Sequence, residues 1–292
     1  MRKGFEPSIR GYRIHAFQAC AFNHSATSLG GPPGERAIPT PGSFCNRQNG
    51  LNGSAVTNPF LHIQGLNNAA FVFCDHASNV VPDDIDLGVS EADMQRHIAW
   101  DIGAEAVSRG LCDALACAGL ICGFSRLVID ANRDPHAPGL IPEESDGTVI
   151  PGNQGLSAAA RQDRIGRFYA PYHAALGEAL DARPGCLALS VHSFTPQLRG
   201  RPKRPTDIGL LVKNDIDTAD ALIAKVAAID ASLRVDINQP YSAHDLNWTV
   251  DHNVVPRDLR HLAIELRQDH LGTDRGVARM VDVLSRAIRP LL

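Results

Sequence analysis

The chain has 292 residues, and its 28 basic and 32 acidic residues give a net charge of −4. This balance provides no basic surface for nucleic acid or an anionic membrane, so we expect neither as a partner. Hydrophobic residues make up 44% of the chain and charged residues 21%, a composition typical of a globular protein. No apolar run reaches the roughly 18 residues of a spanning helix, and no signal peptide is evident. We therefore expect a cytoplasmic protein.

Residues 1–58 differ in character from the rest of the chain. They are rich in glycine, proline and asparagine, as in segments 30–34 and 46–53, and have almost no periodic apolar pattern. Such a composition indicates a disordered leader, or sequence upstream of the natural start. We expect a single folded domain over residues 59–292.

From about residue 68 onward, strand-like and helix-like segments alternate. Short apolar runs predict strands at residues 70–74, 120–129, 187–191, 207–213, 233–237 and 261–267. Apolar residues at helical spacing predict helices at residues 91–118, 157–181, 218–231 and 273–288, with Ser90 and Thr273 capping the first and last. This alternation predicts a three-layer α/β/α domain around a mixed, mostly parallel sheet.

Two of the twelve histidines follow predicted strands. His76 comes after the strand 70–74, and His192 comes directly after the strand 187–191. Ligands bind beyond the carboxyl ends of the strands in sheets of this kind. The two histidines suit a zinc ion held from different elements, with an open position for water. The alternative is that each histidine only forms hydrogen bonds at its strand end.

Glu265 lies within the apolar strand 261–267, where an ionised carboxylate must be paired or functionally employed. A general base that accepts a proton from zinc-bound water would explain this position. The structural alternative is an ion pair with Arg267 or Arg133.

Arginine and asparagine follow the second predicted strand. A guanidinium group binds a carboxylate through two parallel hydrogen bonds, and an adjacent amide adds orientation. Arg126, Asn132 and Arg133 therefore suggest a substrate with a free carboxylate. Arg201 and Arg204 are candidates for a second substrate carboxylate, although a solvated basic loop also explains them.

Two further histidines stay in consideration. His97 and Asp101 lie four residues apart on the first predicted helix, where they either pair or contribute to the site. His252 lies in a polar segment that could close over substrate. The remaining histidines show no pattern beyond loops and helix surfaces.

The seven cysteines are odd in number and include no C-x-x-C pair, which disfavours a disulfide framework or a cysteine-type zinc site. We expect Cys112, Cys117 and Cys122 to be small buried hydrophobic residues.

Six segments together resemble a known family. They are CDHASN at 74–79, HIAWDIGA at 97–104, SRLVIDANR at 125–133, SDGT at 145–148, HSFTP at 192–196 and IELRQD at 264–269. In this order they resemble the successive motifs of the N-formylglutamate amidohydrolase family, over roughly residues 69–288. That family in turn resembles zinc carboxypeptidases and aspartoacylases.

The resemblance implies a phosphorylase/hydrolase-like α/β domain, as in zinc carboxypeptidases, that is catalytic over residues 59–292. It implies hydrolysis of N-formyl-L-glutamate, or a similar N-acyl amino acid, to formate or another carboxylate and the free amino acid. The partner is then a small-molecule N-acyl amino acid, and the pathway is histidine catabolism.

The resemblance also implies roles for individual residues. His76 and His192 would hold one Zn²⁺ per chain, and Glu265 would be the general base for a metal-activated water. Three further residues would contact substrate: Arg126 near the carbonyl oxygen, and Asn132 and Arg133 at the carboxylate.

The third zinc ligand departs from the pattern of the related peptidases. Zinc carboxypeptidases supply a glutamate in H-x-x-E, whereas the corresponding position here is Asn79, a poor neutral ligand for zinc. Either Asn79 coordinates or orients the site, or Asp75, Glu143 or Glu144 completes the shell.

Two rival functions remain open. Cys74 could act as the nucleophile of a thiol amidase. Alternatively, the chain could be an inactive relative that binds acidic metabolites, because Asn79 stands where an acidic ligand is expected.

Overall fold

A computed structural model describes residues 58–198 and 200–292. The expected leader, residues 1–58, lies outside the described residues except for Asn58. The strands are β1 (Phe60–Ile63), β2 (Asn67–Cys74), β3 (Cys117–Cys122), β4 (Glu144–Ser145), β5 (Thr148–Val149), β6 (Leu187–Phe194), β7 (Ile208–Leu211), β8 (Val235–Ile237) and β9 (His261–Arg267). The α-helices are α1 (Glu91–Met94), α2 (Ala104–Leu115), α3 (Ala158–Arg164), α4 (Ala170–Asp181), α5 (Ile216–Ile229) and α6 (Asp274–Ile288).

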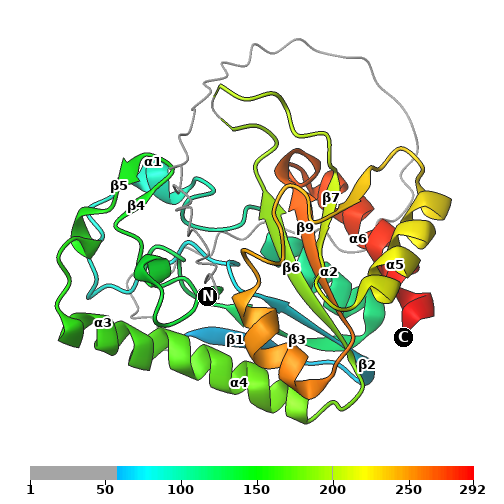
Figure 1. Cartoon of the computed structure of the whole chain (residues 1–292), viewed down its shortest axis with the longest axis horizontal. Coiled ribbons are helices and arrows are strands. Elements are labelled where there is room, and N and C mark those ends of the chain that lie inside the picture. The colour runs from blue at the N-terminus through cyan, green and yellow to red at the C-terminus, as the bar shows by residue number, and fades with distance from the viewer. Residues whose placement is uncertain (1–57, 199) are drawn as a thin grey trace, which may run out of the picture.

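The main sheet has seven strands in the order β1-β3-β2-β6-β9-β7-β8 (Figure 1). The four central strands β3, β2, β6 and β9 run parallel, whereas β1 and β7 run antiparallel to their inner neighbours. The expected mixed, mostly parallel sheet is therefore confirmed. The carboxyl ends of β2, β6 and β9 meet at one edge of the sheet, and β4 pairs only with β5 in a separate hairpin.

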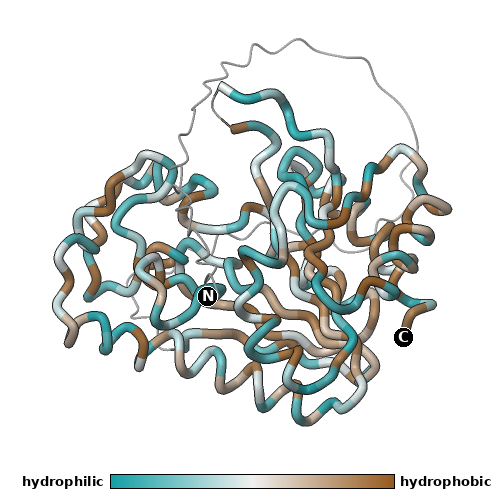
Figure 2. The backbone as a smooth tube through the Cα atoms, in the orientation of Figure 1, coloured by the Kyte–Doolittle hydropathy of each residue, from teal (hydrophilic) through white to brown (hydrophobic). Residues whose placement is uncertain are grey.

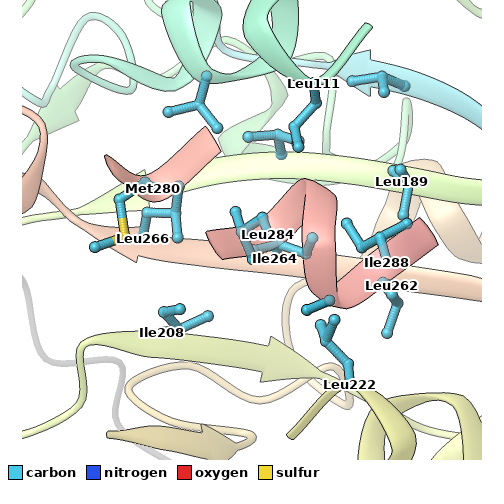
Figure 3. Packing of buried hydrophobic residues seen from close by; sticks show 14 of the residues in the cluster. Leu111, Leu189, Ile208, Leu222, Leu262, Ile264, Leu266, Met280, Leu284 and Ile288 are labelled. Atoms are coloured by element: carbon cyan, nitrogen blue, oxygen red, sulfur yellow. The ribbon is translucent and has the colours of Figure 1, made fainter. Parts of the chain in front are cut away.

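Helices cover both faces of the sheet. Helices α2, α5 and α6 pack on one face, and α4 packs on the other together with loops from the middle of the chain (Figure 1). Figure 3 shows Met280 and Leu284 of α6 beside Leu266 and Ile264 of β9. Every residue of β6 and β9 is buried, because both faces of these strands are covered. Figure 2 shows the contrast between core and surface, with brown hydrophobic strands at the centre and mostly teal loops outside.

The predicted helix at 91–118 is wrong, because the chain forms two helices with an irregular segment at residues 95–103 between them. Ser90 does cap the first helix by accepting a hydrogen bond from the Asp93 backbone. The break follows from tertiary contacts: the Asp101 backbone N–H donates to the His76 carbonyl over 2.8 Å. Gly103 then adopts a left-handed φ of 81°, which ends any continuous helix.

The predicted strand at 120–129 is confirmed only over residues 120–122 and is wrong beyond them, since β3 ends at Cys122. The apolar residues that follow are buried in loop structure against the α4 face. Their backbone polar groups form hydrogen bonds with other loops. For example, the Ser125 N–H donates to the Val80 carbonyl over 2.8 Å. The edge strand β1 was not predicted.

The other predicted elements are confirmed with shifts of a few residues. The predicted helix 157–181 contains a π-helical turn (Ile165–Tyr169) between α3 and α4. Thr273 caps α6 by accepting a hydrogen bond from the Gly276 backbone. Within the two described ranges, no helix is both long enough and apolar enough to cross a membrane.

Candidate active site

A pocket of about 200 Å³ opens at the carboxyl ends of β2, β6 and β9. We call it the central pocket. Six of the predicted site residues line it: His76, Arg126, Asn132, Arg133, His192 and Glu265. Residues far apart in the sequence thus converge at the edge of the sheet where ligands bind in such folds.

Three buried side chains at this pocket form a cluster of potential metal ligands: His76, Asp101 and His192. One ligand atom from each lies within 4.8 Å of the others. The Asp101 Oδ2 atom is 2.9 Å from His192 Nδ1 and 3.5 Å from His76 Nδ1. The strand end of β2, the strand β6 and the irregular segment before α2 each supply one member.

The Nε2 atom of His76 is held by a carboxylate. His76 Nε2 lies 2.7 Å from Asp130 Oδ1. Asp130 also accepts from Arg126 Nη2 at 2.8 Å and from Arg133 Nε at 3.3 Å. We call His76, Asp130, Arg126 and Arg133 the Asp130 arm of the cluster.

A second carboxylate stands behind His192. His192 Nε2 lies 3.5 Å from Asp75 Oδ2, and the Tyr172 hydroxyl donates to Asp75 Oδ1 over 2.6 Å. Tyr172 is 0% exposed and Asp75 is 1% exposed. We call His192, Asp75 and Tyr172 the Asp75 arm. The Asp130 arm includes pocket-lining arginines, whereas the Asp75 arm includes none.

Opposite charges within the cluster shift its pKa values toward the charged forms. Burial alone would lower the pKa of His192, but the hydrogen bond with Asp101 and the nearby carboxylate of Asp75 outweigh it and hold the pKa well above its ordinary value. Burial likewise opposes ionisation of Asp101, but His76 and His192 keep the pKa of this carboxyl well below its usual range. The pKa of His76 is raised despite burial and Arg126, because Asp130 and Asp101 stabilise the imidazolium.

The donor set fits a divalent metal ion. Two imidazole nitrogens and one carboxylate oxygen are typical zinc donors, and three protein ligands are typical of a catalytic zinc site. Among the described residues, His76 Nδ1 has no hydrogen-bond partner although it is buried. A carboxylate behind each histidine would fix the Nε2–H tautomer and leave Nδ1 for the metal.

Glu265 lies directly beside this cluster, because it pairs in register with His192 across β6 and β9. Only 8% of Glu265 is exposed, and its Oε2 atom has no hydrogen-bond partner among the described residues. Burial raises the pKa of Glu265 to about 7, and the neighbouring histidines only partly offset this. A carboxyl group with this pKa can both accept and return a proton near neutral pH.

The ion-pair alternative for Glu265 is not formed. Arg267 instead contacts Asp207 at 2.6 Å and Asp269 at 2.7 Å. Arg133 contacts Asp130, as described above. Glu265 is therefore left without a paired arginine in the described structure.

The four residues considered as the third zinc ligand lie in different surroundings. Asn79 donates through Nδ2 to the Met94 carbonyl over 2.9 Å and does not line the central pocket. Asp75 Oδ2 lies 3.5 Å from His192 Nε2. Glu143 and Glu144 are exposed and also lie outside the pocket lining.

Arg201 and Arg204 do not line the central pocket. Arg201 is exposed in the loop after β6. Arg204 donates to the Thr195 carbonyl over 3.0 Å and lies 5.0 Å from the centre of the Tyr241 ring. Arg204 thereby supports two residues that do line the pocket.

His97 and Asp101 do not form the predicted helix pair, because α1 ends before them. His97 lines the pocket, and its Nε2 lies 3.2 Å from Asp146 Oδ2. Burial lowers the pKa of His97 to about 4, so its ring is neutral at physiological pH. His252 stacks on Trp248 at a ring distance of 5.2 Å and does not line the pocket.

Cys74 is poorly placed for a nucleophile. It is 0% exposed and does not line the central pocket. Burial raises the pKa of its thiol well above the ordinary value, so the reactive thiolate is suppressed. Cys112, Cys117 and Cys122 are buried as expected.

Sequence reasoning missed Asp101 as a member of the cluster. Its position within a predicted helix suggested a pair with His97 or a contribution to the site, but not a metal ligand. Gly103, two residues later, was the available signal, because a glycine within a helical pattern is unfavourable and often marks a break. Asp75 and Asp130 adjoin predicted site residues, but nothing in the sequence indicated that each would face a histidine.

The chain resembles known proteins over most of the described domain. A family model described as N-formylglutamate amidohydrolase matches residues 69–271. The crystal structure of a gene product from Agrobacterium tumefaciens is similar with 32% identity and a TM-score of 0.73, covering 82% of this chain and 96% of that chain.

A second solved structure supports the same fold. N-formylglutamate amidohydrolase from Ralstonia eutropha JMP134 has 22% identity and a TM-score of 0.62, covering 80% of this chain and 96% of that chain. A search of curated protein sequences gives no significant match. The match of the family model, together with the order of its motifs, shows that this chain belongs to the N-formylglutamate amidohydrolase family.

Proposed function

We propose that this protein is a zinc-dependent amidohydrolase that cleaves N-formyl-L-glutamate or a similar N-acyl amino acid. The observation that carries the proposal is the buried cluster of His76, Asp101 and His192, with the unpaired carboxylate of Glu265 beside it. This combination provides a metal site and a proton acceptor in one pocket. Membership of an amidohydrolase family supports the reaction type.

Asp101 is the third zinc ligand in this proposal, in place of Asn79. Its carboxylate carries the negative charge that a neutral amide lacks, and it is 2.9 Å from His192 Nδ1. A zinc ion bound here would lower the pKa of a bound water to about 7 and polarise the substrate carbonyl. Asn79 then has a structural role through its hydrogen bond to the Met94 carbonyl.

Glu265 holds and transfers the proton in this proposal. Its Oε2 atom accepts the proton of the attacking water, and the same carboxyl then gives a proton to the leaving nitrogen. The raised pKa supports both steps, because neither protonation state is strongly favoured near neutral pH.

Arginine and asparagine at the pocket wall bind and orient the substrate. Arg126 lines the pocket and supplies positive charge for the developing oxyanion of the carbonyl. Asn132 and Arg133 line the adjacent wall and hold the substrate carboxylate. The Asn132 Oδ1 atom accepts from the Thr249 backbone over 2.9 Å, which fixes the orientation of its amide.

Metal analysis and a substrate panel test the proposal together. N-formyl, N-acetyl and N-succinyl amino acids are assayed with metal-free protein, before and after addition of zinc. We expect one zinc ion per chain and zinc-dependent release of the free amino acid. Ligand binding without zinc and without hydrolysis would favour the binder of acidic metabolites instead.

A further inference from the structure

The Asp75 arm is a buried chain of contacts that ends at a proposed metal ligand. It begins at Tyr172 on α4, passes through Asp75 at the end of β2 and reaches His192 on β6. Three separate elements therefore meet at one carboxylate. Among the described residues, His192 is the only ion-pair partner of Asp75 within 4 Å.

We propose that Tyr172 is a positioning residue for the metal site, acting through Asp75 on His192; this inference rests on the zinc function proposed above. The Tyr172 hydroxyl donates to Asp75 Oδ1, which orients the carboxylate. Asp75 Oδ2 has no hydrogen-bond partner among the described residues and lies 3.5 Å from His192 Nε2, an ion-pair distance. A carboxylate at Nε2 holds a proton there. The other ring nitrogen, Nδ1, then points its lone pair at the cluster with Asp101.

The burial of the arm explains why a hydroxyl donor matters here. Asp75 and Tyr172 are 1% and 0% exposed, so water cannot replace a lost hydrogen bond without rearrangement. Asp130 has two arginines to hold it in place behind His76, whereas Asp75 has no arginine contact. Tyr172 therefore does for Asp75 what the two guanidinium groups do for Asp130.

The first test compares zinc affinity in wild type, Tyr172→Phe and Tyr169→Phe by competition with a chromogenic chelator. Tyr169 is a matched control, because it is also buried and its hydroxyl donates to the Arg133 carbonyl over 2.9 Å. We expect Tyr172→Phe to weaken zinc affinity about 10-fold, the lower end for residues behind a ligating histidine, and Tyr169→Phe to leave it unchanged. Equal zinc affinity in all three proteins would overturn the inference.

A second measurement needs no variant at the tyrosine. In zinc-loaded wild-type protein labelled with ¹⁵N-histidine, His192 is expected to carry its proton on Nε2 and to coordinate through Nδ1. Assignment follows from the resonance lost in His192→Gln. A His192 ring with its proton on Nδ1 would contradict the inference even if Tyr172→Phe failed to fold.

Asp75→Asn separates the inference from the underlying function. We expect it to weaken zinc affinity more than Tyr172→Phe does, because it removes the negative charge that favours a proton on His192 Nε2. If wild type binds zinc but neither Asp75→Asn nor Tyr172→Phe changes the affinity, the Asp75 arm has no positioning role while the proposed function stands. If wild type binds no zinc, both proposals fail.

Discussion

The two arms of the cluster place a carboxylate behind each histidine but surround it differently. Asp130, behind His76, contacts Arg126 and Arg133, which both line the central pocket. Within the described part of the chain, the side chain of Asp75, behind His192, has recorded hydrogen-bond and ion-pair partners only in the buried Tyr172 and in His192 itself. The same local chemistry is thus connected to the proposed substrate-binding arginines on one side and buried in the core on the other.

This difference separates two proposed tasks within one site, metal binding and substrate binding. A change in the Asp130 arm affects both the cluster and the groups proposed to bind substrate, because the same arginines serve both. A change in the Asp75 arm affects the cluster alone. Measurements of metal affinity and of KM therefore distinguish the arms.

The largest expected effect lies outside both arms, at Glu265. Glu265→Gln removes the proton acceptor but preserves shape, so we expect zinc content to stay at the wild-type level. Turnover of N-formylglutamate should fall by about 100- to 10,000-fold, the usual contribution of a general base. Metal analysis and steady-state kinetics on the same sample check this. Hydrolysis at the wild-type rate would rule out Glu265 as the base.

The Asp130 arm should show a mixed phenotype. We expect Asp130→Asn to weaken zinc affinity by about 10- to 100-fold, as for other carboxylates behind ligating histidines. It should also raise KM at saturating zinc, because Arg126 and Arg133 lose their shared partner. Asp75→Asn is the matched control, with weaker zinc binding but an unchanged KM at saturating zinc. Identical effects of the two variants on KM would contradict the separation of tasks.

Arg133 tests the substrate side of the Asp130 arm without touching a proposed ligand. A hydrogen bond to a charged group contributes about 1.5–3 kcal/mol, so Arg133→Ala should raise KM by about 10- to 100-fold for substrates with a free carboxylate. An amidated substrate should show little change between the two proteins. We expect zinc affinity to fall less than in Asp130→Asn, since Arg126 still contacts Asp130 at 2.8 Å when the 3.3 Å contact of Arg133 is lost. An unchanged KM for every carboxylate substrate would remove the anchor role.

A smaller effect concerns the stability of the metal-free protein. The raised pKa of His192 and the pKa of about 7 for Glu265 mean that the folded state binds more protons than the unfolded state at neutral pH. Stability should therefore fall as pH rises from about 6.5 to about 8, because the lowered pKa values of the buried His97 and His173 act in the opposite direction only below this range. Zinc replaces these protons, so its stabilising effect should grow over the same interval. Thermal unfolding with and without zinc checks this, and a metal-free Tm that rises with pH would contradict it.

The layers of the fold and most of the pocket were predictable from sequence, and the geometry within the pocket was not. The strands β6 and β9 read as continuous apolar runs, so the positions of His192 and Glu265 followed from strand periodicity and the rule for strand ends. The segment 120–129 is equally apolar, but it is buried as loop beyond Cys122. Apolar periodicity reports burial, and it cannot distinguish a strand from a buried loop.

Asp101 illustrates the other limit of sequence reasoning. Its role depends on the break between α1 and α2, which is set by a backbone hydrogen bond to His76, 25 positions earlier in the chain. The Asp75 arm likewise depends on a distant contact, because the hydroxyl of Tyr172 reaches Asp75 from helix α4. Contacts of this kind arise from the packing of distant segments, so local pattern does not predict them.

The central claim is that His76, Asp101 and His192 hold a zinc ion on which hydrolysis depends. The most direct test is a titration of chelator-treated protein with zinc, in which bound metal and release of glutamate from N-formyl-L-glutamate are measured in the same samples. We predict that activity is absent without zinc and rises in proportion to bound metal until one ion per chain is reached. Full activity in protein shown to contain no metal would contradict the claim.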